Sequence, residues 1–347
     1  SLLPDRAQKT LSTLVMRMES GELLRSMAAT DAGGDWSQLA RRRAYARVRE
    51  GWAMDIYGAQ PWQEDGQLHC DNAVWIVSGF VHFGWDLPAN LVPTRRCPGK
   101  CKHKAPRDPA CLDSPEAQAL ARQHAAMKAM HCLESCTENS SVRTGVHDKV
   151  QMIWMLMLKS AGFESVRLED RSFDAAATAD DKDHRRPDIV CVWGGVRYII
   201  DITIAWASEM GAMEWRDVGH DADKAARAKE KSYEEALKRE AEGGHGWLQH
   251  VRGREIDRFI PIAYEMCGTW GTAARSFFKF VVKCAGSEGT RAAELYHWSA
   301  MTFGGHWRRR VAVEIGRGRV NCLGRSADPG YKGNSNPSAE TAPYELR

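Results

Sequence analysis

The sequence lacks any apolar run of the ~18–20 residues that a bilayer-spanning helix needs. Its most apolar stretch, VQMIWMLMLKSAGF, contains Lys159 and predicts a buried helix instead. The N-terminus has none of the features of a signal peptide. The chain begins with Ser-Leu-Leu-Pro-Asp and without an initiator methionine, which predicts a piece of a longer protein. These absences predict an intracellular protein rather than a membrane or secreted one.

The chain also lacks a strong net charge, because 48 basic and 45 acidic side chains leave only +3 at pH 7. The overall balance therefore does not by itself indicate a nucleic-acid partner. Local clusters say more, since residues 94–107 contain six basic side chains and no acidic one: Arg95, Arg96, Lys100, Lys102, Lys104 and Arg107. Such blocks often mark contacts with phosphate. The basic clusters at 41–49 and 308–319 fit a solvated surface equally well.

The ten cysteines do not form the dense framework of a small secreted domain. Several are bunched between Cys97 and Cys136, which is more typical of metal ligands in a reducing compartment. Three residues separate Cys97 from Cys101 and four separate His131 from Cys136, and both spacings suit tetrahedral Zn²⁺. Ordinary buried cysteines are the structural alternative. Other candidate ligands in this stretch are His103, Cys111 and Cys132.

No internal repeat is visible, and the 43% hydrophobic content supports at least one core. Residues 1–95 predict a helical N-terminal region, and 96–146 form a basic, Cys/His-rich segment. Residues 147–285 predict helix, strand, hairpin, long helix, strand and helix, the pattern of a small α/β domain. Further helices are predicted over 286–325, and 326–347 has the composition of a disordered tail.

Two aspartates stand out in the stretch HRRPDIVCVWGGVRYIIDITIAW, residues 184–206. Its apolar residues predict two core strands joined by a tight turn at Gly194-Gly195. Asp188 begins the first strand and Asp201 lies inside the second, where a carboxylate loses hydration at a large free-energy cost unless a partner compensates. Pairing through the turn would bring Asp188 and Asp201 together.

Two close carboxylates favour a divalent cation such as Mg²⁺ or Mn²⁺, and Glu169 is a candidate third oxygen ligand. A turn or cap role is the alternative for Asp188. Salt bridges are the alternative for the pair as a whole, with Arg185 or Arg186 as partners.

The helix predicted over 221–244 places a lysine on its inward face. Ala225, Lys229 and Tyr233 follow one another at helical spacing on that face, whereas Lys231 points to solvent. A cation there could orient water or stabilise the charge that develops at phosphorus during phosphodiester hydrolysis. A side chain that merely extends its charge to the surface is the alternative for Lys229.

The segments RRPDIV, YIIDITI and AKEKSY, in this order, resemble the restriction-enzyme-like endonuclease of non-LTR retrotransposons, a branch of the PD-(D/E)xK nucleases. The resemblance covers residues 97–286 and implies a small mixed β-sheet flanked by helices, with metal-dependent cutting or nicking of DNA. It places Asp188 and Asp201 on the metal-binding acids, and Lys229 and Tyr233 on the helical lysine and tyrosine. Thr203 stands where many PD-(D/E)xK nucleases have the lysine, a departure that fits the retroelement branch.

The same nucleases carry a CCHC zinc knuckle just upstream, which implies Zn²⁺ at Cys97, Cys101, His131 and Cys136. The long stretch between the two halves predicts an inserted helix. An Arg–His pair of the family corresponds to Arg143 and His147, which three residues separate here. Arg143 is then expected to contact DNA, and His147 to contact a phosphate or to transfer a proton. A plain helix-start histidine is the alternative.

Together these patterns predict a Mg²⁺-dependent endodeoxyribonuclease, the C-terminal part of a retrotransposon protein that nicks target DNA to prime reverse transcription. The expected partners are the target duplex and the element's RNA, and the expected location is the nucleus. No reverse-transcriptase signature occurs in the chain, so a polymerase would lie upstream. The main alternative is a catalytically inactive, zinc-dependent nucleic-acid-binding remnant of a retroelement. A host repair or recombination nuclease of the same fold is a third possibility.

Overall fold

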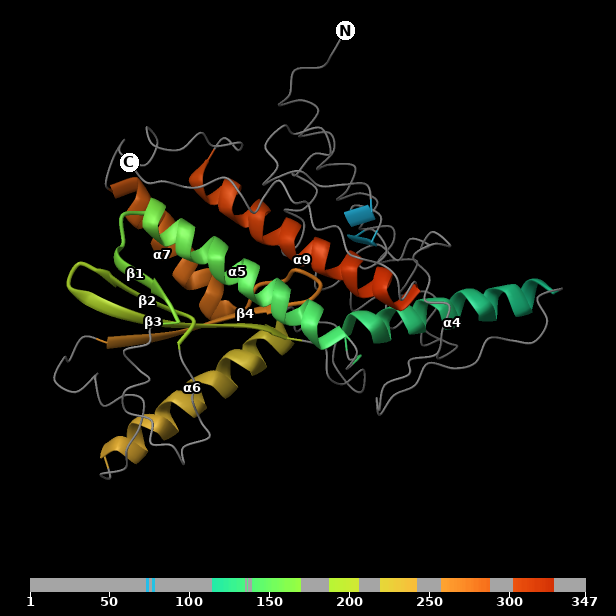
Figure 1. The fold of residues 1–347 in the computed structure, drawn as a ribbon, viewed down its shortest axis with the longest axis horizontal. Helices are drawn as coiled ribbons and strands as arrows, with labels where there is room; N and C mark the ends of the chain where they lie inside the picture. Colours follow the sequence, from blue (N-terminus) through green and yellow to red (C-terminus); the bar gives the residue numbers. More distant parts are fainter. Residues whose placement is uncertain are drawn as a thin grey trace, which may run out of the picture.

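The computed structural model describes residues 73–74, 77–78, 114–134, 136, 139–169, 187–205, 219–241, 257–287 and 302–327. Within these residues a four-stranded sheet has the order β1-β2-β3-β4 (Figure 1). Neighbours β1–β2 and β2–β3 are antiparallel, whereas β3 and β4 are parallel. The strands are β1 (Glu164–Leu168), β2 (Ile189–Trp193), β3 (Val196–Ala205) and β4 (Asp257–Glu265). The prediction of a small mixed sheet flanked by helices is therefore confirmed.

The hairpin β2–β3 closes through the predicted Gly-Gly turn. Gly194 and Gly195 have φ values of 57° and 79°. Both lie in the left-handed region that a tight two-residue hairpin turn requires and that glycine adopts without strain. The turn fixes a register in which Ile189 lies opposite Ile200. Because side chains alternate between the two faces of a strand, this register also decides which residues meet at the open end of the hairpin.

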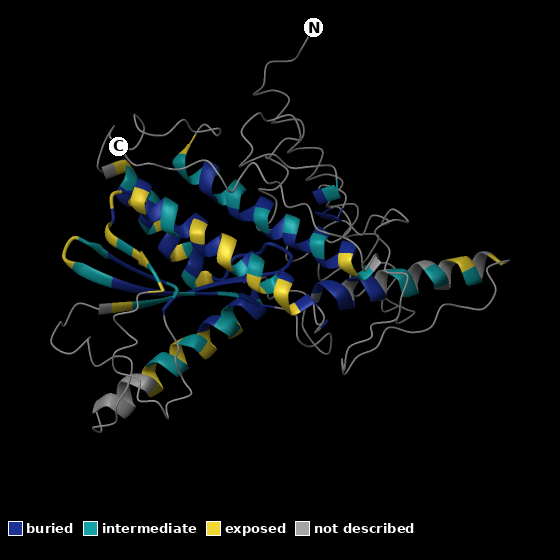
Figure 2. Cartoon of the chain, in the orientation of Figure 1, coloured by how far each residue is buried: buried dark blue, intermediate teal, exposed yellow. Residues whose placement is uncertain are grey.

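Helices cover both faces of the sheet (Figure 1). On one face, α5 (Ser140–Ser160) and α7 (Thr272–Ser287) bury alternate strand residues in an aromatic core. Trp154 of α5 stacks on Phe277 of α7, with ring centroids 5.8 Å apart, and its indole donates a hydrogen bond to Tyr264 of β4. Figure 2 marks the buried residues of these elements in dark blue. This core fixes α5 rigidly above the strands.

On the opposite face, α6 (His220–Ala241) packs through small side chains. Ala222 and Ala226 are buried against Ala263 of β4. Alanines allow the helix backbone to approach the sheet closely, so that a long side chain one turn further along can reach the neighbouring strand. The predicted inward face of this helix is thus observed, and Lys231 is on the solvent side with 77% of its side chain exposed.

The C-terminal helix α9 (Phe303–Ala327) lies along α5 and shares its hydrophobic core. Val311 and Ile315 are fully buried in the same cluster as Val150 of α5. The close approach is made possible by Gly318, since a Cβ atom there would lie 2.2 Å from Cγ2 of Val146. The helix α9, in the segment predicted over 286–325, therefore shares one hydrophobic core with the domain predicted over 147–285.

Helix α4 (Pro115–Glu134) extends away from the sheet and leads into α5 (Figure 1). It accounts for the insertion predicted between the two halves of the zinc motif. Buried Asn139 holds the junction, because its amide donates to the carbonyl oxygens of Cys132 and Cys322, at 3.0 and 3.2 Å. Among the helices that the structure describes, none has the length and apolar character of a membrane span.

Candidate functional site

The two aspartates meet where β2 begins. Extending the pairing of Ile189 with Ile200 by one residue places Asp188 opposite Asp201. The main-chain N–H of Ile202 donates to Oδ2 of Asp188 at 2.5 Å. In a longer hairpin a main-chain carbonyl of β2 would accept this N–H, and here the Asp188 side chain accepts it instead. Only 14% of the Asp188 side chain and 22% of the Asp201 side chain are exposed, so both carboxyls have lost most of their hydration.

The ammonium group of Lys229, on α6, contacts both carboxylate oxygens of Asp201. Its Nζ lies 3.0 Å from Oδ1 and 3.0 Å from Oδ2. Burial raises the pKa of Asp201 from 3.8 to about 6, while the charge of Lys229 opposes the rise and the carboxyl of Asp188 adds to it. Even with its own cation, Asp201 is therefore held in an environment that disfavours its ionised form.

His147 of α5 contacts Asp188 from the other face of the sheet. Its Nε2 lies 3.3 Å from Oδ2 of Asp188 and 3.2 Å from the carbonyl oxygen of Ile202, and its Nδ1 lies 3.1 Å from Oδ1 of Asp148. All three partners are acceptors, so both ring nitrogens are best matched as donors. The hydrogen bond to Asp188 accordingly raises the pKa of His147 from 6.5 to about 9. The ring is an imidazolium near neutral pH.

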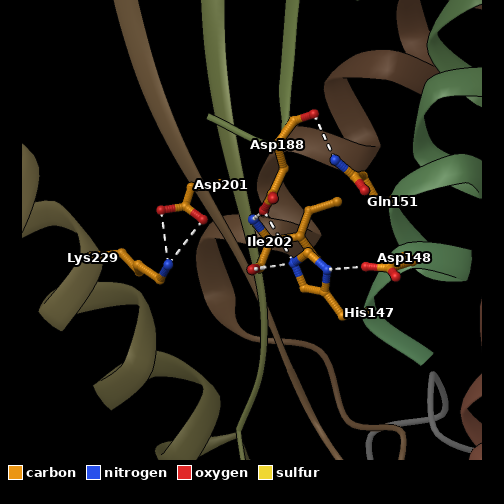
Figure 3. Close-up of polar contacts among 7 residues, drawn as sticks. All are labelled: His147, Asp148, Gln151, Asp188, Asp201, Ile202 and Lys229. Atoms are coloured by element: carbon orange, nitrogen blue, oxygen red, sulfur yellow. Dashed lines mark hydrogen bonds and ion pairs between the residues drawn. The ribbon is translucent and has the colours of Figure 1, made fainter. Parts of the chain in front are cut away.

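The arrangement is a row of four charged side chains that runs through the sheet (Figure 3). Two adjacent carboxylates lie at its centre, with Lys229 on the α6 side and His147 on the α5 side. Mg²⁺ commonly binds through one or two carboxylates and completes its shell with water and substrate phosphate. Asp188 and Asp201 fit that role, and the carbonyl of Ile202 lies beside them as a further oxygen donor.

No protein-family model matches this chain, and no curated protein matches its sequence.

Glu169 lies beside Asp188 and contacts it through its backbone, not through its carboxylate. Its N–H donates to the carbonyl oxygen of Asp188 at 3.1 Å, its φ is 40°, and its side chain is exposed. Within the described residues, no three His, Cys, Asp or Glu side chains are grouped as ligands for a metal. The geometry thus does not join the Glu169 carboxylate to the aspartate pair, because the left-handed backbone turns the chain away after β1.

Tyr233 follows Lys229 by one helical turn, as predicted, and its ring stacks on Phe259 of β4. The two ring centroids are 4.3 Å apart and the planes differ by 11°. Phe259 pairs with Ile199, two residues before Asp201. The structure therefore places the Tyr233 ring over β4 and beside the charged row, where its aromatic contact holds α6 in place.

Gln151 is a site residue that the sequence analysis missed. Its Nε2 donates to the carbonyl oxygen of Asp188 at 2.8 Å, and only 4% of the residue is exposed. Gln151 follows His147 by four residues, so both lie on one face of α5. A buried amide four residues after His147, among apolar residues of the same helix, was the available signal.

The predicted zinc ligands are described only in part. His131 and Cys136 are buried, and the N–H of Cys136 donates to the carbonyl of His131 at 3.0 Å. Arg143 donates to the carbonyl of Cys136 at 2.7 Å, so its guanidinium supports this bend in the chain. Its predicted contact with DNA stays a prediction. Outside the described residues lie the other predicted zinc ligands and the basic cluster: Cys97, Cys101, Arg95, Arg96, Lys100, Lys102, Lys104 and Arg107.

Proposed function

We propose that this chain is a Mg²⁺-dependent endodeoxyribonuclease whose site is the Asp188–Asp201 pair between Lys229 and His147. The observation that supports it is the adjacency of two poorly hydrated carboxyls, one of which has its pKa raised to about 6. Strongly perturbed acids next to fixed cations are characteristic of catalytic sites. Two ion pairs that served only stability could lie apart from each other, and they would not need their two carboxylates to be adjacent.

The chemistry follows from the charges in the row. A divalent cation bound by Asp188 and Asp201 would polarise the scissile phosphate and activate a water molecule. On this proposal Lys229, which contacts Asp201, would stabilise the negative charge that develops on the phosphoryl oxygens. His147, as an imidazolium, is suited to bind a phosphate oxygen or to protonate the leaving oxygen, and it is unsuited to act as a base at neutral pH.

The resemblance of RRPDIV, YIIDITI and AKEKSY to the retrotransposon endonucleases supports DNA as the substrate. On this proposal the chain nicks a target duplex for target-primed reverse transcription, with the element's RNA as a further partner, and acts in the nucleus. Zn²⁺ at Cys97, Cys101, His131 and Cys136, with the basic cluster beside it, would hold the phosphate backbone without reading sequence.

A second candidate function is binding without catalysis. One observation favours it: each aspartate already has its own cation, Lys229 for Asp201 and His147 for Asp188. Paired in this way, the acids would be stable as structural salt bridges. The two candidates differ in whether Mg²⁺ produces cleavage.

A supercoiled-plasmid nicking assay in Mg²⁺ tests the proposal, with Lys229→Met and Lys231→Met as the matched pair. We expect Lys229→Met to lower kcat by about 10²–10³-fold, the usual loss on removing a group that stabilises transition-state charge. Lys231 is exposed and pairs with Glu235, so Lys231→Met should retain wild-type activity. Zinc-dependent DNA binding without nicking by any of the three proteins would favour the binding function.

A further inference from the structure

Two successive turns of α5 hold a single residue of the sheet (Figure 3). His147 contacts the carboxylate of Asp188, and Gln151 contacts its main-chain carbonyl. The two contacts are made at opposite ends of the same residue. Helix α5 thus controls both where the backbone of Asp188 lies and where its side chain points.

Backbone pairing brings Asp188 to the edge of the hairpin but does not by itself set the direction of its side chain. Strand β2 begins at Ile189, so Asp188 lies just before the part of the hairpin that the strand pairs define. The contacts from His147 and Gln151 of α5 add to this backbone pairing in fixing the aspartate beside Asp201.

The amide of Gln151 is not required to satisfy the Asp188 carbonyl. That oxygen already accepts the N–H of Glu169 at 3.1 Å, and a carbonyl has two lone pairs. An apolar side chain of similar size would fill the same buried space at a smaller desolvation cost. What the amide adds is a second, directed contact that limits rotation of the backbone at Asp188.

We infer that Gln151 is a positioning residue that sets the carboxylate of Asp188 for metal binding. This inference rests on the proposed nuclease function for its catalytic consequence. The geometric part can be measured in metal-free protein, because the Asp188 carboxylate accepts the N–H of Ile202. The state of that amide proton reports where the carboxylate lies.

The test compares Gln151→Met, which keeps the length but has no donor, with Ser160→Ala as the control. Ser160 is a buried polar residue of the same helix, and its hydroxyl donates to the carbonyl of Leu156 within α5. In EDTA we expect the Ile202 amide of Gln151→Met to exchange with deuterium about tenfold faster relative to Ile200, with its proton resonance shifted upfield. Ser160→Ala should leave that ratio unchanged.

In the nicking assay, Gln151→Met should raise the Mg²⁺ concentration for half-maximal rate by about 10–100-fold, the usual loss when an outer partner of a metal ligand is removed. The KM for DNA should stay within twofold of the wild type, whereas a general loss of folding would lower all rates together. If Gln151→Met does not fold, Gln151→Leu replaces it, since leucine also lacks the donor and adds no charge.

An unchanged Ile202 amide in the folded variant would overturn the positioning role. So would an unchanged Mg²⁺ requirement in an active enzyme. Loss of Ile202 protection together with no nicking by the wild type would refute the proposed function alone and leave the geometric role of Gln151 in place.

Discussion

Asp201→Asn is expected to raise the free energy of unfolding above pH 6 while it abolishes Mg²⁺-dependent nicking. Burial raises the pKa of Asp201 from 3.8 to about 6, so the folded protein binds this proton more tightly than the unfolded chain does. Wild-type stability therefore falls as the pH rises from about 4 to about 6, through the interval between the two pKa values. Asparagine does not titrate and avoids that loss.

The expected increase in the free energy of unfolding of Asp201→Asn over the wild type is small near pH 4. It reaches about 1–3 kcal/mol above pH 6, since one pKa unit corresponds to about 1.4 kcal/mol. The lower figure allows for the weaker contact of a neutral amide with Lys229. Urea unfolding in EDTA at pH 4.5, 6 and 7.5 measures the difference directly. Adding Mg²⁺ should stabilise the wild type and leave Asp201→Asn unchanged, because the cation needs both carboxylates.

Asp148→Asn serves as the control for this prediction. Asp148 contacts the far side of His147 and its side chain is 60% exposed, so the change should cost at most about 0.5 kcal/mol. A lower stability of Asp201→Asn than of the wild type at pH 7.5 would show that the ion pair with Lys229 outweighs the burial of the charge. That result would favour a structural salt bridge over a metal site.

Gly318→Ala is expected to destabilise the protein by about 1–3 kcal/mol and to lower nicking activity as well. The new Cβ would lie 2.2 Å from Cγ2 of Val146, a β-branched side chain that has little freedom to move within α5. Relief requires α5 and α9 to separate. Val146 immediately precedes His147, so a shift of α5 also displaces the imidazolium from Asp188. Thermal unfolding and the plasmid assay measure the two effects.

Gly145→Ala provides the opposite control on the neighbouring helix. A Cβ at Gly145 meets nothing within 4 Å, so alanine should stabilise α5 by about 0.5–1 kcal/mol through its higher helix propensity. The contrast separates a local clash from a general effect of glycine replacement. Equal responses at the two positions would contradict the proposed close contact between α5 and α9.

The sequence pattern was sufficient to predict those parts of the site that depend on contacts between residues close together in the chain. Alternation and the Gly-Gly turn predicted the hairpin that aligns Asp188 with Asp201, and helical spacing predicted that Lys229 faces inward. Gln151 was missed because its partner, a main-chain carbonyl, lies 37 residues away and carries no side-chain signature. Glu169 was assigned from its position next to a strand, which does not reveal a left-handed backbone. The α5–α9 contact at Gly318 depends on packing between distant segments.

The chain order of the strands has a consequence for folding. The β2–β3 hairpin joins neighbouring segments, so it can close early and bring Asp188 and Asp201 together, whereas the parallel β3–β4 pair must wait for the long excursion through α6. Lys229 belongs to α6, which lies between β3 and β4 in the chain, and His147 belongs to α5, which precedes the hairpin. If the hairpin closes first, the two acids meet before Lys229 is in place, and their mutual repulsion opposes that step. We expect the refolding rate to fall as the pH rises through the carboxyl range and to recover when divalent cations are added.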